Sequence, residues 1–248
     1  MDSTSLFTRL ASAYASSRPT YPPEILALLS LHVPPPAYAV DIAAGTGIFS
    51  QCLLQNGYNV TAVEPNPAMR SEIFHSAISQ RVSIVAGTAE STGLKEHSAD
   101  LITIAQAFHW VDPEATRLEF KRIGKPSCLT AVVWNSRNFS NSSFMMQYKM
   151  LLEEFAPAYR SMKTHWSNLD VRVKNFFLGK YKYDQASHIL SVDEDQMIGN
   201  LLSLSYAPPE ATPEHKIFIN QAREIFSKHQ KGGYVQFDLT THLFTGNL

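Results

Sequence analysis

Short apolar runs rich in β-branched residues alternate with segments of helical period at least four times between residues 37 and 134. Such runs are typical of parallel strands buried on both faces, and parallel neighbours must be joined by crossover segments, which are usually helices. The alternation therefore predicts an α/β fold with a parallel sheet. The expected strands are AYAVDI at 37–42, NVTAVE at 59–64, VSIVAG at 82–87, DLITIAQAF at 100–108 and CLTAVVW at 128–134.

Capping signals mark where helices begin. Asn66 and Asp112 are each followed by proline, which is a cap and first-turn pair, so helices are expected from there to about residues 75 and 124. Ser191 and Glu194 fit the S-x-x-E capping box ahead of a third helix. Beyond residue 134 the expected elements are a helix at 144–155, a strand at 182–190, a helix at 194–204, a helix that begins at 212–213 and a final antiparallel strand at 234–244.

A tight glycine turn follows the first expected strand. Asp41 closes that strand, and Gly45 and Gly47 open the next helix, so the backbone can approach a ligand where any Cβ would collide. Glu64 ends the second strand, 23 residues after Asp41, where a carboxylate can accept both hydroxyls of a ribose. In an open parallel sheet these positions share one crevice, at the carboxyl ends of the strands.

Two cofactor classes use such a turn. A nicotinamide-dependent oxidoreductase would use Gly45, Gly47 and Ser50 as a degenerate GxGxxG motif, but the third glycine is absent. A carboxylate near the loop repels a pyrophosphate and attracts an ammonium and a sulfonium. The pattern thus favours S-adenosylmethionine over NAD(P).

Composition limits the remaining classes of function. The 248 residues carry 21 Lys and Arg against 22 Asp and Glu, so the basic surface that a nucleic-acid binder needs is not expected. Cys52 and Cys128 lie in separate apolar stretches, and no His, Cys and Asp cluster has metal-ligand spacing. Nowhere do eighteen apolar residues occur in succession, and the basic start of a secretory leader is absent. We expect a cytoplasmic protein without a membrane partner or a metal.

Several motifs together resemble those of the class I S-adenosylmethionine-dependent methyltransferases, in the branch of the trans-aconitate methyltransferases and, more distantly, the ubiquinone and menaquinone C-methyltransferases. The motifs are YASSRPTYP at 14–22, DIAAGTG at 41–47, VEPNPAM at 63–69, AGTAE at 86–90, AQAFHWVDPE at 105–114, SLSY at 203–206 and LTTHLF at 239–244. The resemblance implies a Rossmann-like, mostly parallel sheet of seven strands in the order 3-2-1-4-5-7-6, with helices on both faces and a helical cap.

The resemblance also implies a division of the chain and a set of binding residues. Residues 1–248 would form one methyltransferase domain, with an N-terminal lid at 1–36, a cofactor-binding half at 37–134, a substrate-cap insertion at 135–182 and C-terminal sheet completion at 183–248. The implied cofactor-binding residues are Tyr14, Arg18, Asp41, Ala43, Gly45, Gly47, Glu64, Pro65, Met69, Gly87, Thr88, Ala89, Gln106, Ala107 and Phe108.

Some of these positions have distinct expected roles. Tyr14 would cover the methionine part of the cofactor, and Arg18 would pair with its carboxylate. Thr88 stands where the family commonly has an acidic residue on the adenine amine. Recognition of the adenine would then depend on the Thr88 hydroxyl, on backbone groups of Thr88 and Ala89, and on apolar packing by Met69. His109 would face the acceptor and act as the catalytic residue, by orienting it or by removing a proton.

The expected activity is methylation of a small organic molecule, at an oxygen rather than a carbon. A carboxylate acceptor is already an anion at neutral pH, so placing the reactants matters more than a general base. Arg137, Arg160 or Lys163 could hold an acidic acceptor. Two alternatives stay open: a methyltransferase-like protein that binds the cofactor for a regulatory or other non-methylating role, and the less favoured oxidoreductase.

Overall fold

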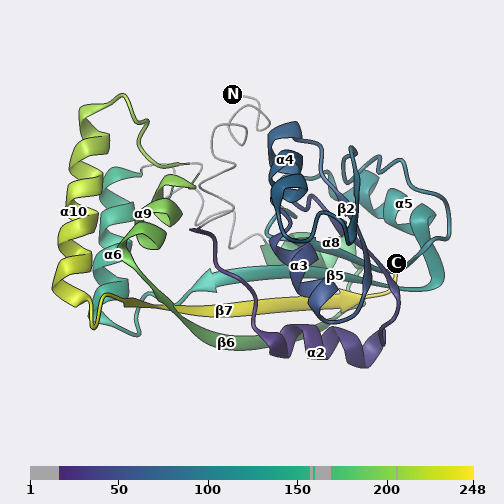
Figure 1. Ribbon diagram of the computed structural model, residues 1–248. Helices are drawn as coiled ribbons and strands as arrows, with labels where there is room; N and C mark the ends of the chain where they lie inside the picture. The colour runs from purple at the N-terminus through teal and green to yellow at the C-terminus, as the bar shows by residue number, and fades with distance from the viewer. Residues whose placement is uncertain (1–16, 157–158, 160–168, 205) are drawn as a thin grey trace.

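The sheet has seven strands in the order β3-β2-β1-β4-β5-β7-β6. The computed structural model describes residues 17–156, 159, 169–204 and 206–248. Strands β1 to β5 pair in parallel and β7 is antiparallel to both β5 and β6, which confirms the fold and the strand order that the resemblance implied (Figure 1). The strands are β1 Tyr38–Ile42, β2 Asn59–Val63, β3 Val82–Val85, β4 Ala99–Ala105, β5 Gly124–Arg137, β6 Lys182–Val192 and β7 Val235–Gly246.

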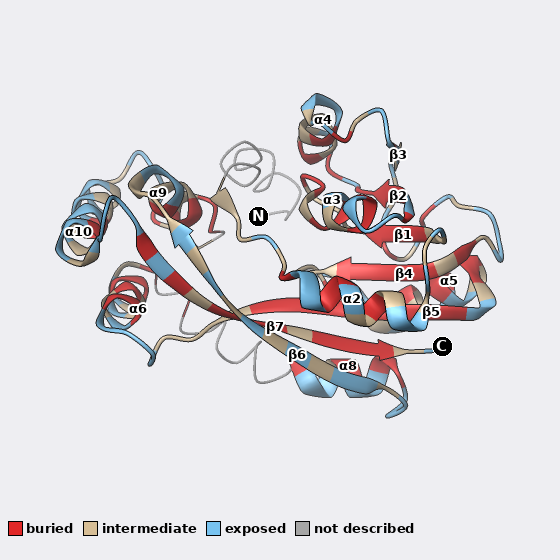
Figure 2. Cartoon of the chain, turned by 60° about the horizontal axis from the view of Figure 1, so that its bottom comes forward, coloured by how far each residue is buried: buried red, intermediate tan, exposed pale blue. Residues whose placement is uncertain are grey.

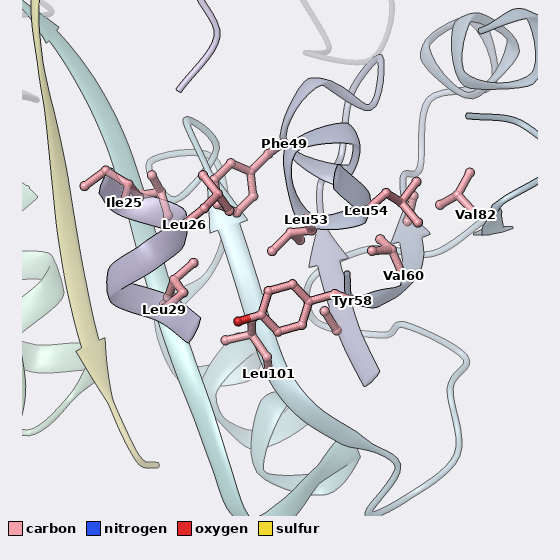
Figure 3. Close-up of a cluster of buried hydrophobic side chains, with 14 of the residues drawn as sticks. Ile25, Leu26, Leu29, Phe49, Leu53, Leu54, Tyr58, Val60, Val82 and Leu101 are labelled. Atoms are coloured by element: carbon pink, nitrogen blue, oxygen red, sulfur yellow. The ribbon is translucent and has the colours of Figure 1, made fainter. Parts of the chain in front are cut away.

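Helices cover both faces of the sheet because neighbouring strand residues point to opposite sides. On one face Ala39 packs with α2 Pro23–His32, α3 Ile48–Gln55 and Ile73 of α4 Pro67–His75. Figure 3 shows this layer, with Leu26, Phe49 and Leu53 above the strands. On the other face Val40 packs with α5 Pro113–Ile123 and α8 Leu169–Phe176. Buried residues accordingly fill the central strands, whereas the edge strand β6 is buried nowhere along its length (Figure 2).

A third layer of three helices lies at the far end of the long strands (Figure 1). They are α6 Ser143–Phe155, α9 Glu194–Leu202 and α10 Pro213–His229. Their apolar faces meet each other and the ends of β6 and β7 in a separate core that includes Tyr148, Met197, Phe218 and Phe237. The carboxyl ends of β1 and β4 therefore face a second body of structure, which can close a site there.

The structure divides the cap and the lid differently from the expected segments. Of the expected cap at 135–182, α6 joins the helical layer, but α8 packs on the sheet, where Phe176 meets Phe108 and Phe120 edge to face at 5.0 and 5.9 Å. Helices α9 and α10, expected with the C-terminal sheet, complete the cap. Helix α2 of the expected lid is part of the sheet core. Apolar stripes, rather than chain order, decide which layer each helix joins.

Two of the capping predictions hold and one is wrong. Asn66 Oδ1 accepts hydrogen bonds from Ala68 N and Met69 N at the start of α4, and Asp112 caps α5 in the same way. The predicted box at Ser191 and Glu194 is not formed, because Ser191 lies in β6 and pairs with Gln236 of β7. Asp193 caps α9 instead, in a reciprocal capping box with Gln196.

Within the described ranges, no helix combines the length and the apolar character needed to cross a bilayer.

Candidate functional site

The glycine turn lies between the end of β1 and the start of α3, and it needs left-handed backbone. Gly45 and Gly47 have φ of 59° and 86°, and Ala43 before them has φ of 51°. A Cβ at Gly47 would lie 3.2 Å from Cγ1 of Ile73, whereas no atom lies within 4 Å of the Cβ position at Gly45. Gly47 therefore allows the turn to pack on α4, and Gly45 keeps the turn open toward a ligand.

Asp41 lies beneath this turn, almost fully buried. Ser50 Oγ donates to its Oδ2 at 2.6 Å and Thr103 Oγ1 donates to its Oδ1 at 3.0 Å, so the carboxylate joins β1 to α3 and to β4. Burial raises the pKa of Asp41 to about 6, even though the two hydroxyls oppose that rise. At neutral pH Asp41 is therefore mostly an anion. Its negative charge, near the carboxyl end of β1, would stabilise a cationic ligand group.

Glu64 follows β2 and holds the turn from the other side. Its Oε2 accepts a hydrogen bond from Gly45 N at 2.8 Å, and its Oε1 accepts one from Asn66 N at 2.8 Å. Burial raises its pKa, opposed by these backbone hydrogen bonds. A carboxylate oxygen has about two acceptor positions, so each oxygen can still accept a hydroxyl. The side chain expected on the ribose is thus fixed beside the glycine turn.

The segment after β3 is tied to α5. Glu119 of α5 accepts hydrogen bonds from Thr92 N at 2.8 Å and from Thr92 Oγ1 at 2.5 Å, and Arg122 donates to both of its carboxylate oxygens at 2.7 Å. The Arg122 hydrogen bonds lower the pKa of Glu119 to about 2. Thr88 is exposed, and its Oγ1 accepts from Ser91 N at 3.2 Å. No pattern in the sequence predicted these hydrogen bonds between Thr92 and Glu119.

A cavity of about 140 Å³ opens between the glycine turn, the end of β4 and the cap. Six of the predicted cofactor-binding and catalytic residues line it: Arg18, Asp41, Ala43, Gly45, Gln106 and His109. Nine others do not: Gly47, Glu64, Pro65, Met69, Gly87, Thr88, Ala89, Ala107 and Phe108. Tyr14 lies outside the described residues. Arg137, predicted as a residue that could hold an acidic acceptor, lines it too, whereas Arg160 and Lys163 lie outside the described residues. The cavity thus gathers the residues expected at the methionine end of the cofactor, and those expected at the ribose and adenine lie beyond it.

The end of β4 presents both a polar group and aromatic rings to the cavity. Gln106 has a left-handed backbone with φ of 59°, and its Nε2 donates to Asn135 O at 3.1 Å. The His109 ring lies 5.0 Å from that of Trp134, edge to face, and 4.6 Å from that of Trp110. Phe108 instead points into the sheet core. The turn after β4, in which Trp110 N donates to Ala107 O, therefore leaves His109 at the cavity and Phe108 in the core.

Several lining residues were not predicted. They are Pro19, Ala44, Thr46, Ile48, Phe49, Ala105, Trp110, Trp134, Asn135, Leu204, Tyr206 and Leu239. Trp134 ends the fifth expected strand and Asn135 follows it, so the strand-end rule could have found them. Leu204 and Tyr206 belong to the SLSY motif at 203–206, which could have indicated them, but only the packing of the cap brings them to the cavity. Among the described residues, no group of three His, Cys, Asp or Glu could hold a metal ion.

Comparisons with known proteins agree with this geometry. Residues 40–132 match the family model of the methyltransferase domain. The chain is 38% identical over 133 residues to an uncharacterised methyltransferase of Mycobacterium tuberculosis, a match that covers 53% of each protein. The chain therefore spans about half the length of the first curated relatives that it matches.

Solved structures extend the likeness of fold to nearly the whole chain. A proposed type II methyltransferase of Anaeromyxobacter dehalogenans superposes with a TM-score of 0.63 at 18% identity, over 93% of this chain and 97% of that one. An S-adenosylmethionine-dependent methyltransferase of Geobacter sulfurreducens, solved with S-adenosyl-L-homocysteine, has a TM-score of 0.50 at 14% identity, over 97% and 96%. At such identities the likeness shows the fold alone.

Proposed function

We propose that this chain, whose residues 40–132 match the family model of the methyltransferase domain, binds S-adenosylmethionine and transfers its methyl group to an oxygen of a small-molecule acceptor. The observation that carries the proposal is the cavity at the carboxyl ends of β1 and β4, where Asp41, the open turn at Gly45 and His109 meet. Its position matches the crevice where open α/β sheets bind ligands. The Geobacter relative in fold was solved with the demethylated form of the same cofactor.

The residues present fit this cofactor. Asp41 supplies a buried negative charge for a ligand with an ammonium and a sulfonium, and Gly45 leaves the space that a side chain would fill. Glu64 is fixed where it can accept ribose hydroxyls. Arg18 brings a guanidinium, whose Nη2 donates to Ser203 O at 2.7 Å, into the cavity for the cofactor carboxylate. The two carboxylates beside the turn would repel the pyrophosphate of NAD(P).

S-adenosylmethionine supplies a methyl group made electrophilic by a sulfonium sulfur. The chain contributes mainly by placing the acceptor, which can supply roughly 7–11 kcal/mol of the barrier. His109, between Trp110 and Trp134, can orient an acceptor oxygen or take the proton of a hydroxyl. The cap closes the cavity with Leu204 and Tyr206, which supports a small acceptor. The finer placement beside the trans-aconitate methyltransferases is supported by sequence motifs.

Calorimetry with S-adenosylmethionine, S-adenosylhomocysteine and NAD tests the cofactor, followed by transfer of a labelled methyl group to a panel of organic acids and phenols. We expect both sulfur compounds to bind, NAD not to bind, and the label to appear in an ester or ether. Binding of NAD alone would refute the proposal. Binding of the sulfur compounds with no labelled product from any acceptor would instead support the non-methylating alternative.

A further inference from the structure

Arg137 is a largely buried cation at the end of β5, with its side chain at the cavity. Its Nη2 donates to Asn200 Oδ1 at 2.8 Å, and its guanidinium carbon lies 5.8 Å from the centre of the Tyr148 ring. Across the described ranges, no carboxylate lies within ion-pair distance of Arg137 and its buried Nε has no hydrogen-bond partner. Its immediate partners are thus an amide and phenols, which carry no counter-charge at neutral pH.

A buried charge without a counter-ion is costly, so such a group usually either loses its charge or meets an opposite charge. Arginine cannot lose its charge at physiological pH. Burial lowers the pKa of Arg137, but Tyr148, Tyr206 and Tyr159 oppose this when their phenols ionise at high pH, so the pKa stays above its ordinary value. The cavity therefore holds a permanent positive charge that the described residues do not neutralise.

Asp41 does not serve as this counter-ion. Among the described residues no ion pair joins it to Arg137, and its oxygens accept hydrogen bonds from Ser50 of α3 and Thr103 of β4. The cavity is thus bipolar, with a carboxylate beside the glycine turn and a guanidinium on the cap side. A cationic cofactor group suits the first end, and an anionic ligand group suits the second.

Asn200 of α9 fixes the guanidinium. It is fully buried, and its Oδ1 also accepts a hydrogen bond from Tyr148 Oη at 3.1 Å. Its Nδ2 donates to Ser17 O at 3.2 Å, in the segment that carries Arg18. One amide therefore joins β5, α6, α9 and the N-terminal segment. The Asn200 amide thus has partners for both of its polar atoms, and these hydrogen bonds hold the guanidinium of Arg137 in one position.

We propose that Arg137, positioned by Asn200, binds a carboxylate of the methyl acceptor other than the oxygen that receives the methyl group. This inference rests on the proposed function. A guanidinium fork matches a carboxylate, and Nε together with an Nη can bind it through two hydrogen bonds. The same contact on the reacting oxygen would withdraw the charge that makes it nucleophilic, so the bound carboxylate is a second group of the acceptor. Arg137 then sets both the affinity and the orientation of the acceptor.

The test measures the thermal midpoint of the protein, with and without S-adenosylhomocysteine, against succinate, succinamate and succinamide at constant ionic strength. These probes carry two, one and no carboxylates on the same four-carbon frame. We expect succinate to raise the midpoint most and succinamide least. We expect Arg137→Met to weaken succinate binding on the order of 100-fold, as for loss of a charged hydrogen-bonded pair. Equal shifts with succinamide and succinate would overturn the proposal.

Two further variants separate binding from folding. Arg223→Met removes one positive charge from an exposed ion pair with Glu194 and should keep the full succinate response. Asn200→Asp retains Arg137 but sets a carboxylate against it, so it should abolish the response in a folded protein. A full succinate response in Asn200→Asp would contradict the inference, even if Arg137→Met failed to fold.

The same measurements separate this inference from the proposed function. If S-adenosylhomocysteine does not bind while the succinate response still depends on Arg137, the anion site stands and the proposed cofactor does not. If S-adenosylhomocysteine binds while Arg137→Met leaves the succinate response unchanged, the proposed function stands and the anion site is refuted.

Discussion

The buried carboxylate of Asp41 makes the stability of the fold depend on pH in a direction opposite to that of most acidic groups. Burial raises its pKa from an ordinary 3.8 to about 6, so the folded protein holds the proton more tightly than the unfolded chain does. Its contribution to stability is therefore fully present below pH 3.8 and is lost as the pH rises to about 6. The rise in pKa corresponds to about 3 kcal/mol in total, of which about 2 kcal/mol falls between pH 4.5 and 7.5.

Asp41→Asn removes this titration and retains a side chain of the same shape that Ser50 and Thr103 can still contact. We expect the unfolding free energy of the variant, relative to the wild type, to increase by about 2 kcal/mol between pH 4.5 and 7.5. Urea unfolding at four pH values across this window measures the difference. A difference that stays constant with pH would show that Asp41 titrates normally, and the argument that burial raises its pKa would then be wrong.

Asp100→Asn is the matched control for this experiment. Burial raises the pKa of Asp100, but hydrogen bonds from Lys125 Nζ at 2.7 Å and Tyr38 N at 3.0 Å outweigh it and lower the pKa overall. Its stabilising contribution is therefore present at neutral pH and lost in acid. That loss falls below the ordinary pKa of 3.8, so between pH 4.5 and 7.5 the stability of the control variant relative to the wild type should stay nearly constant. A common slope in both variants would point to a general effect of pH on the chain.

Three further predictions follow from the site. Gly47→Ala should destabilise the fold by about 1–3 kcal/mol, because the new Cβ would contact Ile73 and the backbone has a left-handed φ. Gly45→Ala should mainly weaken S-adenosylhomocysteine binding. Unfolding measures the first effect and calorimetry the second. His109→Ala should lower turnover of a hydroxyl acceptor by about 10²–10⁴-fold and largely spare a carboxylate acceptor, and unchanged turnover of a hydroxyl substrate would remove His109 from the role of base. Glu119→Gln should lower the free energy of unfolding by about 2–3 kcal/mol at pH 7, because a folded pKa of about 2 makes the carboxylate stabilising above pH 4.5. Unfolding measurements in acid should show the difference between variant and wild type shrinking below about pH 4.

Local sequence patterns determined the parallel half of the sheet. Apolar runs, glycines and the Asn66 and Asp112 caps act within a few residues of chain, so each strand and crossover helix could be located from its own segment. The same rules placed Asp41 and Glu64 at the carboxyl ends of their strands, where an open parallel sheet forms its binding crevice. The capping box at α9 shows how short motifs mislead. Ser191 fits the pattern two residues before Asp193, and only the pairing of β6 with β7 decides between them.

Tertiary structure alone decided the polarity of the cavity. The motifs suggested contacts for Asp41 and Arg18, but they could not show that Ser50 and Thr103 occupy both oxygens of Asp41. Arg137 is one of several cations in the sequence, and only the packing of α6 and α9 against β5 buries it beside an amide rather than a carboxylate. Burial and electrostatic environment arise from contacts between segments far apart in the chain, whereas secondary structure is set largely by neighbours. The sequence thus determined where the site lies, and the fold decided which of its charges remain unpaired within the described structure.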